Sequence, residues 1–313
     1  MFEYIPFKPL PGLSSPHAQT IVASFTRPGI TPPSNPLLVP LKDGDAIFCE
    51  VSQPLDWVEN KKTIVMVHGL AGSTTSNYMV RIARKLFEAG YRVVRVNLRG
   101  SGQGSHLARL PYHGGSSGDV LAVLQHLKEL TPYSPFVLVG FSLGGNIALK
   151  LSGELDSDCT SLLESTIAIC SPIDLEETIH LLAKPANKLY QRFYLGQMLQ
   201  QTQRWTKGRE ISSLYEYDSL ITAPIWGFSS AEAYYRHSSS RYYLPNIKHP
   251  CYVLLTEDDP FVDHRQLMSC PLPSNIKVAL CQNGGHMGFL GWTGMEHRHF
   301  WLDQHLLNWI DNN

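Results

Sequence analysis

The sequence lacks an excess of charge of either sign. Its 313 residues include 26 lysines and arginines and 27 aspartates and glutamates, so the formal net charge is −1 at pH 7. A chain without a dominant field of one sign is poorly suited to bind nucleic acid. The balance therefore favours a neutral or mildly charged small molecule as the partner, and we expect no nucleic acid partner.

Long apolar runs are also missing. No stretch of 18 apolar residues occurs, so we expect no integral membrane segment. The first residues, MFEYIPFKPLPGLSSPHAQT, lack the basic start and the apolar run of a secretory signal. We therefore expect a cytoplasmic location. No pattern in the sequence predicts an oligomeric state.

Spacings typical of metal and cofactor sites are absent as well. There is no H-E-x-x-H, and the RGSGQG segment lacks the helix start that a phosphate-binding loop needs. No C-x-x-C pair occurs among the six cysteines, which are Cys49, Cys159, Cys170, Cys251, Cys270 and Cys281. We therefore expect unpaired thiols in a reducing compartment, and neither a metal nor an organic cofactor.

What the sequence does contain is an alternation of short apolar runs with helical periodicity. A hairpin around Asp43-Gly44 precedes six runs typical of buried strands, which are TIVMVHG, YRVVRVNL, PFVLVGF, STIAICSP, PCYVLLTEDDP and IKVALCQNGGH. Strands that alternate with helices form parallel sheets covered on both faces. The sequence therefore predicts an α/β core over 36–170 and 246–313, with a mostly parallel sheet of eight strands flanked by helices.

Two segments depart from this alternation. Residues 1–35 contain seven prolines, which predicts an extended N-terminal arm lying over the core. Residues 171–245 lack the strand pattern, and 12 of the 32 aromatic residues lie between Tyr190 and Tyr243. We expect this insertion to be a mainly helical cap, or lid, over the core.

Ser142 is the candidate nucleophile. In Gly140-Phe141-Ser142-Leu143-Gly144, the serine follows a predicted strand and precedes a predicted helix. Glycines two residues before and after it allow the sharp turn that exposes a nucleophilic hydroxyl. The alternative is a glycine-rich helix start in which the serine only caps the helix, and the strand-to-helix context favours the catalytic interpretation.

A serine needs a general base, and the base needs an orienting carboxylate. His286 in NGGHMGF follows the last predicted strand. The TEDDPFVD loop after the preceding strand supplies the acid, for which we favour Asp259, with Asp258 as the alternative. The other acids of this loop, Glu257 and Asp263, are expected to be solvated or to cap a helix. The order Ser142, Asp259, His286 is that of α/β-hydrolases.

A tetrahedral intermediate also requires backbone donors for its oxyanion. One is expected to be the N–H of Leu143, directly after the nucleophile. The second should come from HGLAGS after the first long strand, and Leu70 is favoured over Ala71. His68 in the same loop is expected to be structural.

Seven motifs in order along nearly the whole chain carry a family resemblance. They are SPHAQTI, VHGLAGS, NLRGSG, YHGGSSGDV, GFSLGGN, DDPFVDH and GGHMGF, and they resemble the YheT-like branch of the α/β-hydrolases, whose eukaryotic relatives include phospholipase-like enzymes and alcohol acyltransferases. The resemblance implies that Ser142, Asp259 and His286 form a charge relay. It also implies an esterase-like activity, often on short or medium acyl chains, without metal or organic cofactor. Asn97 stands where many hydrolases carry an aspartate, and we interpret it as structural.

The sequence therefore predicts a carboxylic ester hydrolase that works through an acyl-enzyme. Two alternatives stay open: transfer of the acyl group to an alcohol, and a non-catalytic ligand-binding protein on the same fold. A basic run over 184–209 could contact anionic lipid head groups at a membrane surface. A solvated helix face over a packed aromatic stripe is the favoured interpretation of that run.

Overall fold

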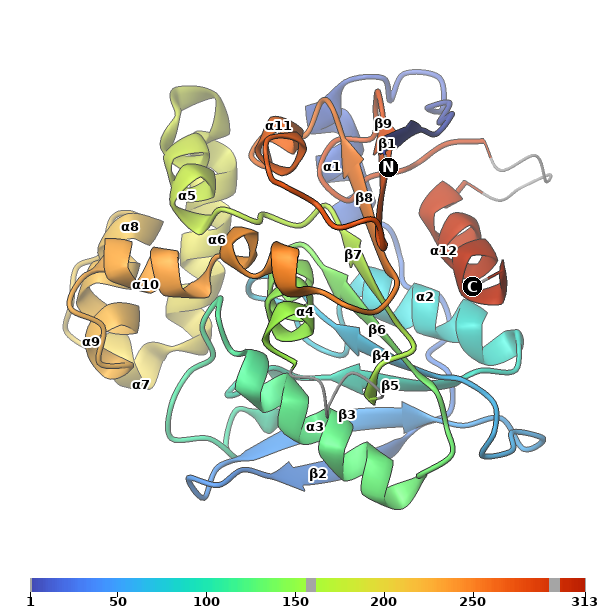
Figure 1. The fold of residues 1–313 in the computed structure, drawn as a ribbon. Coiled ribbons are helices and arrows are strands. Elements are labelled where there is room, and N and C mark those ends of the chain that lie inside the picture. Colours follow the sequence, from blue (N-terminus) through green and yellow to red (C-terminus); the bar gives the residue numbers. More distant parts are fainter. Residues whose placement is uncertain (1, 156–161, 293–298, 313) are drawn as a thin grey trace.

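The computed structural model describes residues 2–155, 162–292 and 299–312, and a single mixed sheet crosses its centre (Figure 1). The strand order is β1-β9-β8-β7-β6-β4-β5-β3-β2, with only the β2–β3 and β3–β5 pairs antiparallel. The strands are β1 (Phe2–Tyr4), β2 (Asn35–Pro40), β3 (Ala46–Ser52), β4 (Thr63–Val67), β5 (Arg92–Val96), β6 (Phe136–Phe141), β7 (Ser165–Ile169), β8 (Cys251–Thr256) and β9 (Ile276–Cys281). The α/β architecture with a mostly parallel sheet is confirmed.

Within the described ranges the sheet has nine strands rather than the eight expected. The additional strand is β1, which pairs in parallel with β9 at the sheet edge. The N-terminal segment is also not extended throughout, because it contains helix α1 (Pro16–Ser24). Pro16 stands at the start of that helix, where its missing N–H costs no hydrogen bond. Counting prolines could not separate this helix-starting proline from those that prevent a helix.

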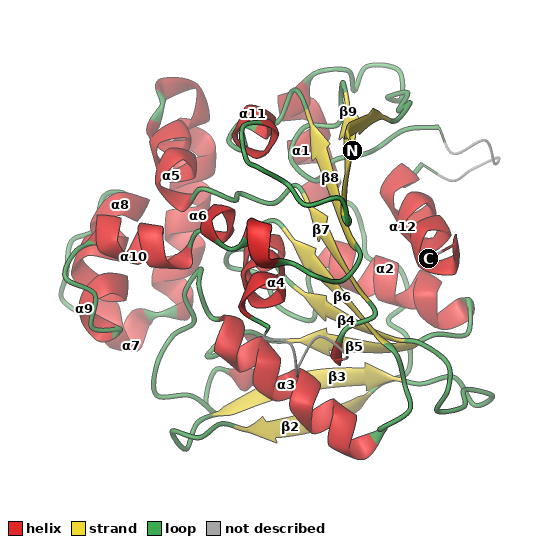
Figure 2. Ribbon diagram, in the orientation of Figure 1, coloured by secondary structure: helices red, strands yellow, loops and turns green. Residues whose placement is uncertain are grey.

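Helices cover both faces of the sheet, as Figure 2 shows. On one face, α3 (Ser117–Leu130) and α4 (Leu143–Glu154) pack against side chains such as Val65 and Val67. The opposite face, which includes Ile64 and Met66, packs against α2 (Asn77–Glu88) and α12 (Trp301–Asn312). Strands β4 to β8 are buried along their whole length, which explains their nearly continuous apolar sequences.

The residues between β7 and β8 form a group of helices beside the sheet (Figure 1). We call residues 171–245 the cap segment. Its helices are α5 (Leu175–Ala183), α6 (Lys188–Gln201), α7 (Gln203–Thr206), α8 (Leu214–Tyr217), a π-helical turn (Asp218–Thr222), α9 (Ala223–Ile225) and α10 (Ala231–Ser238). The short helix α11 (His264–Met268) follows β8.

Two further expectations concern membranes and thiols. No helix in the described ranges has the length and apolar character that a bilayer crossing requires. The described cysteines, Cys49, Cys170, Cys251, Cys270 and Cys281, are free thiols, and Cys159 lies outside the described residues.

Candidate active site

Ser142 occupies the turn between β6 and α4. Its backbone has φ 50° and ψ −121°, a region that a serine rarely adopts and that costs about 1–3 kcal/mol. The Ser142 N–H donates to Ile169 O at the end of β7 (2.8 Å), which holds the turn against the sheet. The backbone therefore has the strained strand-to-helix geometry of a nucleophile elbow.

The glycines around Ser142 allow this turn through close contacts between backbones. A Cβ on Gly140 would lie 2.3 Å from Gly144 O, and one on Gly144 would lie 2.4 Å from Val67 O of β4. Any larger residue at either position would push α4 away from the carboxyl ends of the strands. The sequence motif G-x-S-x-G thus reflects a steric requirement at this point of the fold.

The structure brings Ser142, His286 and Asp259 into one hydrogen-bonded chain. Ser142 Oγ lies 2.8 Å from His286 Nε2, and His286 Nδ1 lies 2.7 Å from Asp259 Oδ2. The side chains of His286 and Asp259 are 3% and 1% exposed, so water is largely excluded from the pair. These are the contacts that a nucleophile, a general base and an orienting carboxylate require.

The loop after β8 fixes the Asp259 carboxylate through its own backbone. Asp259 Oδ1 accepts hydrogen bonds from the N–H groups of Phe261 and Val262, both at 3.0 Å, so Oδ2 is free to contact His286. The Phe261 ring packs against the His286 imidazole, with ring centroids 4.2 Å apart. The Pro260-Phe261-Val262 turn therefore orients the Asp259 carboxylate and shields the His286 imidazole.

The other acids of this loop have different contacts. Asp258 accepts the Gly285 N–H at 2.9 Å, and burial raises the pKa of its carboxyl. Glu257 accepts a hydrogen bond from the Tyr4 hydroxyl, and Asp263 caps α11 by accepting the Arg265 N–H. None of these three carboxylates is hydrogen-bonded to His286 in the described part of the chain.

Sequence reasoning missed the contribution of α1 to the histidine loop. Thr20 Oγ1 accepts the His286 N–H at 2.8 Å, and Gln19 bridges to both the N–H and the C=O of Leu290. Both side chains are buried although they lie in a proline-rich segment. The available signal was the presence of glutamine and threonine three and four residues after Pro16, within the SPHAQTI motif.

The loop after β4, residues 68–72, lies beside the nucleophile. The N–H groups of Gly69 and Ala71 donate to the hydroxyls of Tyr78 (2.8 Å) and Tyr112 (2.7 Å). In contrast, neither the Leu70 N–H nor the Leu143 N–H has a hydrogen-bond acceptor among the described residues. Leu70 and Leu143 line the same pocket as Ser142.

His68 and Asn97 have structural contacts, as expected. His68 Nε2 accepts the Leu98 N–H (3.1 Å), so Nδ1 carries the proton and donates to Gly69 O (2.7 Å). Burial lowers the pKa of His68 to about 4, which keeps the ring neutral. Asn97 Oδ1 accepts the Thr74 N–H at 2.9 Å and supports the start of the segment leading to α2.

A pocket of about 740 Å³, including its open mouth, extends from Ser142 under the cap segment. Most of the lining is apolar or aromatic and comes from the cap segment and the loops near Ser142, including Leu143, Leu175, Ile179, Leu182, Tyr194, Met198, Leu214, Phe261 and Val262. The pocket could therefore hold an apolar chain attached to a carbonyl at Ser142.

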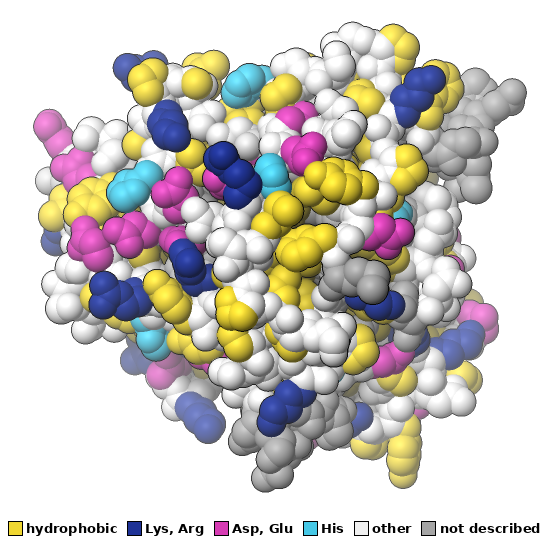
Figure 3. Space-filling view, turned by 45° about the horizontal axis from the view of Figure 1, so that its top comes forward, with side chains coloured by type: hydrophobic (Ala, Val, Ile, Leu, Met, Phe, Trp, Pro, Cys, Tyr) yellow, Lys and Arg dark blue, Asp and Glu magenta, His cyan; other side chains and the backbone are white. Residues whose placement is uncertain are grey.

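Basic and acidic side chains are mixed over the face shown in Figure 3. Within the basic run over 184–209, Lys184, Lys188 and Arg192 are exposed, whereas Tyr190 is buried. Leu189 and Phe193 of α6 are exposed as well, so only part of the apolar surface of this run is packed. No cluster of three His, Cys, Asp or Glu side chains in the described ranges could hold a metal ion.

Comparison with known proteins agrees with this geometry. Residues 62–291 match the family model described as the alpha/beta hydrolase fold. The chain is 30% identical to the putative esterase YheT of Escherichia coli, over 97% of this chain and 92% of that protein. It is also 26% identical to mouse phospholipase ABHD3, over 75% of this chain and 63% of the relative.

Solved structures of low sequence identity share the fold. An esterase from Pyrococcus furiosus, Pf2001, superimposes with a TM-score of 0.62 at 15% identity, covering 99% of this chain and 98% of the esterase. One family is indicated by all of these observations: the motifs, the sheet order, the elbow at Ser142 and the family match. The chain belongs to the α/β-hydrolase family, in its YheT-like branch.

Proposed function

We propose that this protein is a serine esterase that hydrolyses carboxylic esters of short or medium acyl chains through an acyl-enzyme. The observation that carries the proposal is the Ser142–His286–Asp259 hydrogen-bonded chain, whose serine lines a largely apolar pocket. Ser142 is the nucleophile, His286 is the general base and acid, and Asp259 orients the imidazole and stabilises its protonated form.

Acylation begins when Ser142 Oγ forms a bond to the ester carbonyl carbon. The hydroxyl proton passes to His286 Nε2, and the carbonyl electron pair becomes an oxyanion. When this intermediate collapses, the bond to the leaving alcohol breaks, and the alcohol oxygen takes the proton from His286. Asp259 keeps its negative charge throughout and supports the positive charge on the imidazole.

Deacylation repeats these steps with water as the nucleophile. Water gives a proton to His286 as its oxygen bonds to the acyl carbon, and collapse then breaks the bond to Ser142, which recovers the proton. In both steps the oxyanion accepts hydrogen bonds from the N–H groups of Leu143 and Leu70. Each such donor contributes about 3 kcal/mol to stabilisation of the transition state in enzymes of this kind.

The pocket supports the substrate class. Its lining is largely apolar, so an acyl chain gains roughly 0.8 kcal/mol for each CH₂ group that it buries. We propose that the cap segment, residues 171–245, forms the wall that limits chain length. The putative esterase among the relatives is consistent with this class.

A series of p-nitrophenyl esters from acetate to dodecanoate, combined with fluorophosphonate labelling, tests the proposal. We expect turnover that peaks at short or medium chains, one probe molecule bound per chain, and loss of both in Ser142→Ala. A protein that neither turns over the esters nor reacts with the probe would instead be a ligand-binding member of the fold. A dominant ethyl ester product in added ethanol would assign acyl transfer in place of hydrolysis.

A further inference from the structure

The loop from His68 to Gly72 contains a residue in an unfavourable backbone conformation. Ala71 has φ 57°, in the left-handed region, where a residue with a Cβ is disfavoured by roughly 1–2 kcal/mol. Such a conformation persists only where surrounding contacts hold it. We call residues 68–72 the oxyanion loop, after the role proposed for its Leu70 N–H.

Side chains engage the peptide groups on either side of Leu70. Gly69 donates its N–H to Tyr78 Oη and accepts a hydrogen bond from His68 Nδ1 at its carbonyl. Ala71 donates its N–H to Tyr112 Oη (2.7 Å) and accepts a hydrogen bond from Gln201 Nε2 at its carbonyl (2.8 Å). Both neighbours are fixed in this way, whereas the Leu70 N–H has no acceptor among the described residues and Leu70 lines the pocket together with Ser142.

The bond to the Ala71 carbonyl comes from the cap segment. Gln201 is the last residue of α6, 130 residues away from Ala71 in sequence. The same helix contacts the other side of Ala71 indirectly, because Met198 Sδ accepts a hydrogen bond from the Tyr112 hydroxyl at 3.7 Å. Helix α6 therefore reaches the oxyanion loop by two routes, one direct and one through Tyr112.

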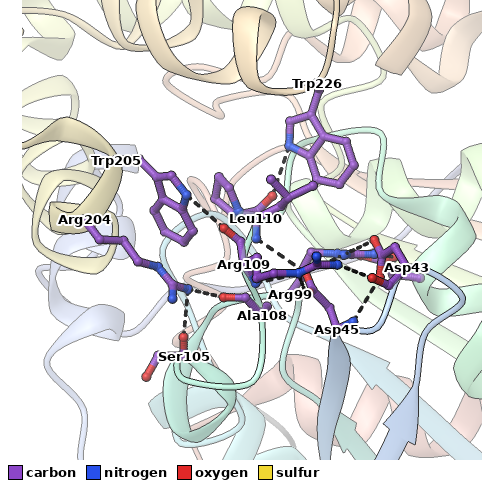
Figure 4. Close-up of polar contacts among 12 residues, drawn as sticks. Asp43, Asp45, Arg99, Ser105, Ala108, Arg109, Leu110, Arg204, Trp205 and Trp226 are labelled. Atoms are coloured by element: carbon purple, nitrogen blue, oxygen red, sulfur yellow. Dashed lines mark hydrogen bonds and ion pairs between the residues drawn. The ribbon is translucent and has the colours of Figure 1, made fainter.

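Contacts from the core and from the cap segment meet at the residues that come before Tyr112 (Figure 4). The preceding segment, residues 105–111, offers backbone carbonyls to three cap side chains. Trp205 and Trp226 donate to Arg109 O and Pro111 O, both at 3.0 Å, and Arg204 donates to Ser105 O at 2.9 Å.

The core holds the other side of the same segment. Asp45 accepts the Arg109 N–H at 3.0 Å and forms a buried ion pair with Arg99 (2.8 Å). Although burial opposes it, hydrogen bonding by Arg109 and Arg99 lowers the pKa of Asp45 to about 2, so this anchor stays charged at neutral pH. The position of Tyr112 therefore depends on both the core and the docked cap segment.

We propose that Gln201 and Tyr112 are positioning residues that fix the Leu70 N–H for oxyanion stabilisation, so that docking of the cap segment completes the oxyanion hole. The inference rests on the proposed esterase function and assigns the cap a part in the chemical step in addition to substrate binding. Neither side chain needs to touch the substrate for this role. A misplacement of a donor by even 1 Å can lower turnover by up to about 100-fold.

The test compares Gln201→Met with Gln200→Met, an identical substitution at the adjacent exposed glutamine. Tyr112→Phe serves as an independent second variant. For each protein we would measure kcat and KM for p-nitrophenyl butyrate, the Kd of butylboronic acid, the Ki of butyrate and the Tm. The boronic acid forms a tetrahedral adduct with the serine and so reports the oxyanion hole, whereas butyrate reports pocket binding.

We expect Gln201→Met to lower kcat about tenfold with KM nearly unchanged, as loss of an interaction made only in the transition state should do. Boronic acid affinity should fall by the same factor, while the butyrate Ki stays the same. Tyr112→Phe should lower kcat and boronic acid affinity by at least the same factor. The double variant should lose less than the product of the two single effects, because both side chains hold the same residue, Ala71, one at its N–H and the other at its carbonyl.

Two results would overturn the inference while leaving the esterase proposal intact. One is a Gln201→Met protein with wild-type kcat and boronic acid affinity. The other is a loss confined to KM and the butyrate Ki, which would make Gln201 part of the acyl pocket. A wild-type protein that neither hydrolyses the ester nor binds the boronic acid would overturn the proposed function on which the inference rests.

Discussion

The core and the cap segment specify their contributions to the site in different ways. In the core, Ser142 follows β6 directly, Asp259 comes three residues after β8 and His286 five residues after β9, so strand pattern and motif place all three. In the cap segment, Gln201, Arg204 and Trp226 act through hydrogen bonds to backbone carbonyls far away in sequence. Local sequence therefore encodes the proposed reacting groups, whereas the tertiary fold alone reveals the contacts from the cap segment to the oxyanion loop and to residues 105–111.

The core and the cap segment also differ in how their own structure is stabilised. Core strands such as β4 and β6 are buried throughout, while α7, α8 and α9 have only three or four residues each. Helices this short have almost no intrinsic stability in water. The cap segment therefore depends on its contacts with the core, and substitutions in the two regions should separate loss of chemistry from loss of cap docking.

The largest effect should follow from the core nucleophile. Ser142→Ala removes the only group that forms the acyl bond, so kcat should fall roughly 10⁴- to 10⁶-fold. The strained elbow relaxes little on this change, and the Tm should stay close to that of the wild type. Steady-state kinetics and a thermal melt check both statements, and substantial residual turnover would point to another nucleophile.

A smaller but still large effect should separate the two neighbouring aspartates of the core. Asp259→Asn should lower kcat by roughly 10³- to 10⁴-fold, because an amide no longer orients and stabilises the imidazole. Asp258→Asn is the matched control, since its remaining amide oxygen can still accept the Gly285 N–H. We expect the control to keep activity within about threefold. The reverse order in the two kcat values would assign the orienting role to Asp258.

Loss of the hydrogen bonds from Trp205 and Trp226 to the 105–111 segment should have a moderate effect on catalysis. Trp205→Phe and Trp226→Phe keep an aromatic ring but remove the N–H donated to the 105–111 segment. Each lost hydrogen bond costs about 1 kcal/mol, so we expect a several-fold fall in kcat/KM for each variant. Faster proteolysis within the cap segment, followed by mass spectrometry, should accompany it. Unchanged kinetics and an unchanged cleavage rate in both variants would show that these two hydrogen bonds do not hold the cap segment on the core.

The smallest effect should be on stability and its pH dependence. Asp218 lies in the π-helical turn of the cap segment, and burial raises the pKa of its carboxyl to about 6, although Thr222 and Tyr235 donate hydrogen bonds to it. The folded state thus binds this proton more tightly than the unfolded state, whose pKa is near 3.8. Its stabilising contribution is complete below about pH 4 and is lost as the pH rises through about 6.

Asp218→Asn mimics the protonated carboxyl, so the variant should not lose stability as the pH rises through about 6. We expect its Tm above pH 6 to exceed that of the wild type by on the order of a few degrees, with the difference disappearing near pH 4. Melts over this pH range provide the comparison. A wild-type Tm that rises relative to the variant between pH 4 and 6 would contradict the sign.

Sequence alone predicted the α/β core and the motifs around the site because both depend on local patterns. Periodicity identified the buried strands, and G-x-S-x-G marks a turn that only small residues at 140 and 144 permit. It did not predict β1, whose three residues gain their partner only when β9 is in place. Nor could it indicate that Thr20 supports His286, because that contact joins residues 266 positions apart. The boundaries of the cap segment and the cytoplasmic location stay predictions.

The most direct test of the account is to trap the covalent intermediate. Wild-type protein mixed with p-nitrophenyl butyrate and quenched in acid within milliseconds would be digested and analysed by peptide mass spectrometry. The account predicts one butyryl group on the peptide that contains Ser142, appearing with the burst of nitrophenolate and disappearing as substrate is consumed. Turnover without any acylated peptide, or with the acyl group on a different residue, would contradict the proposed role of Ser142.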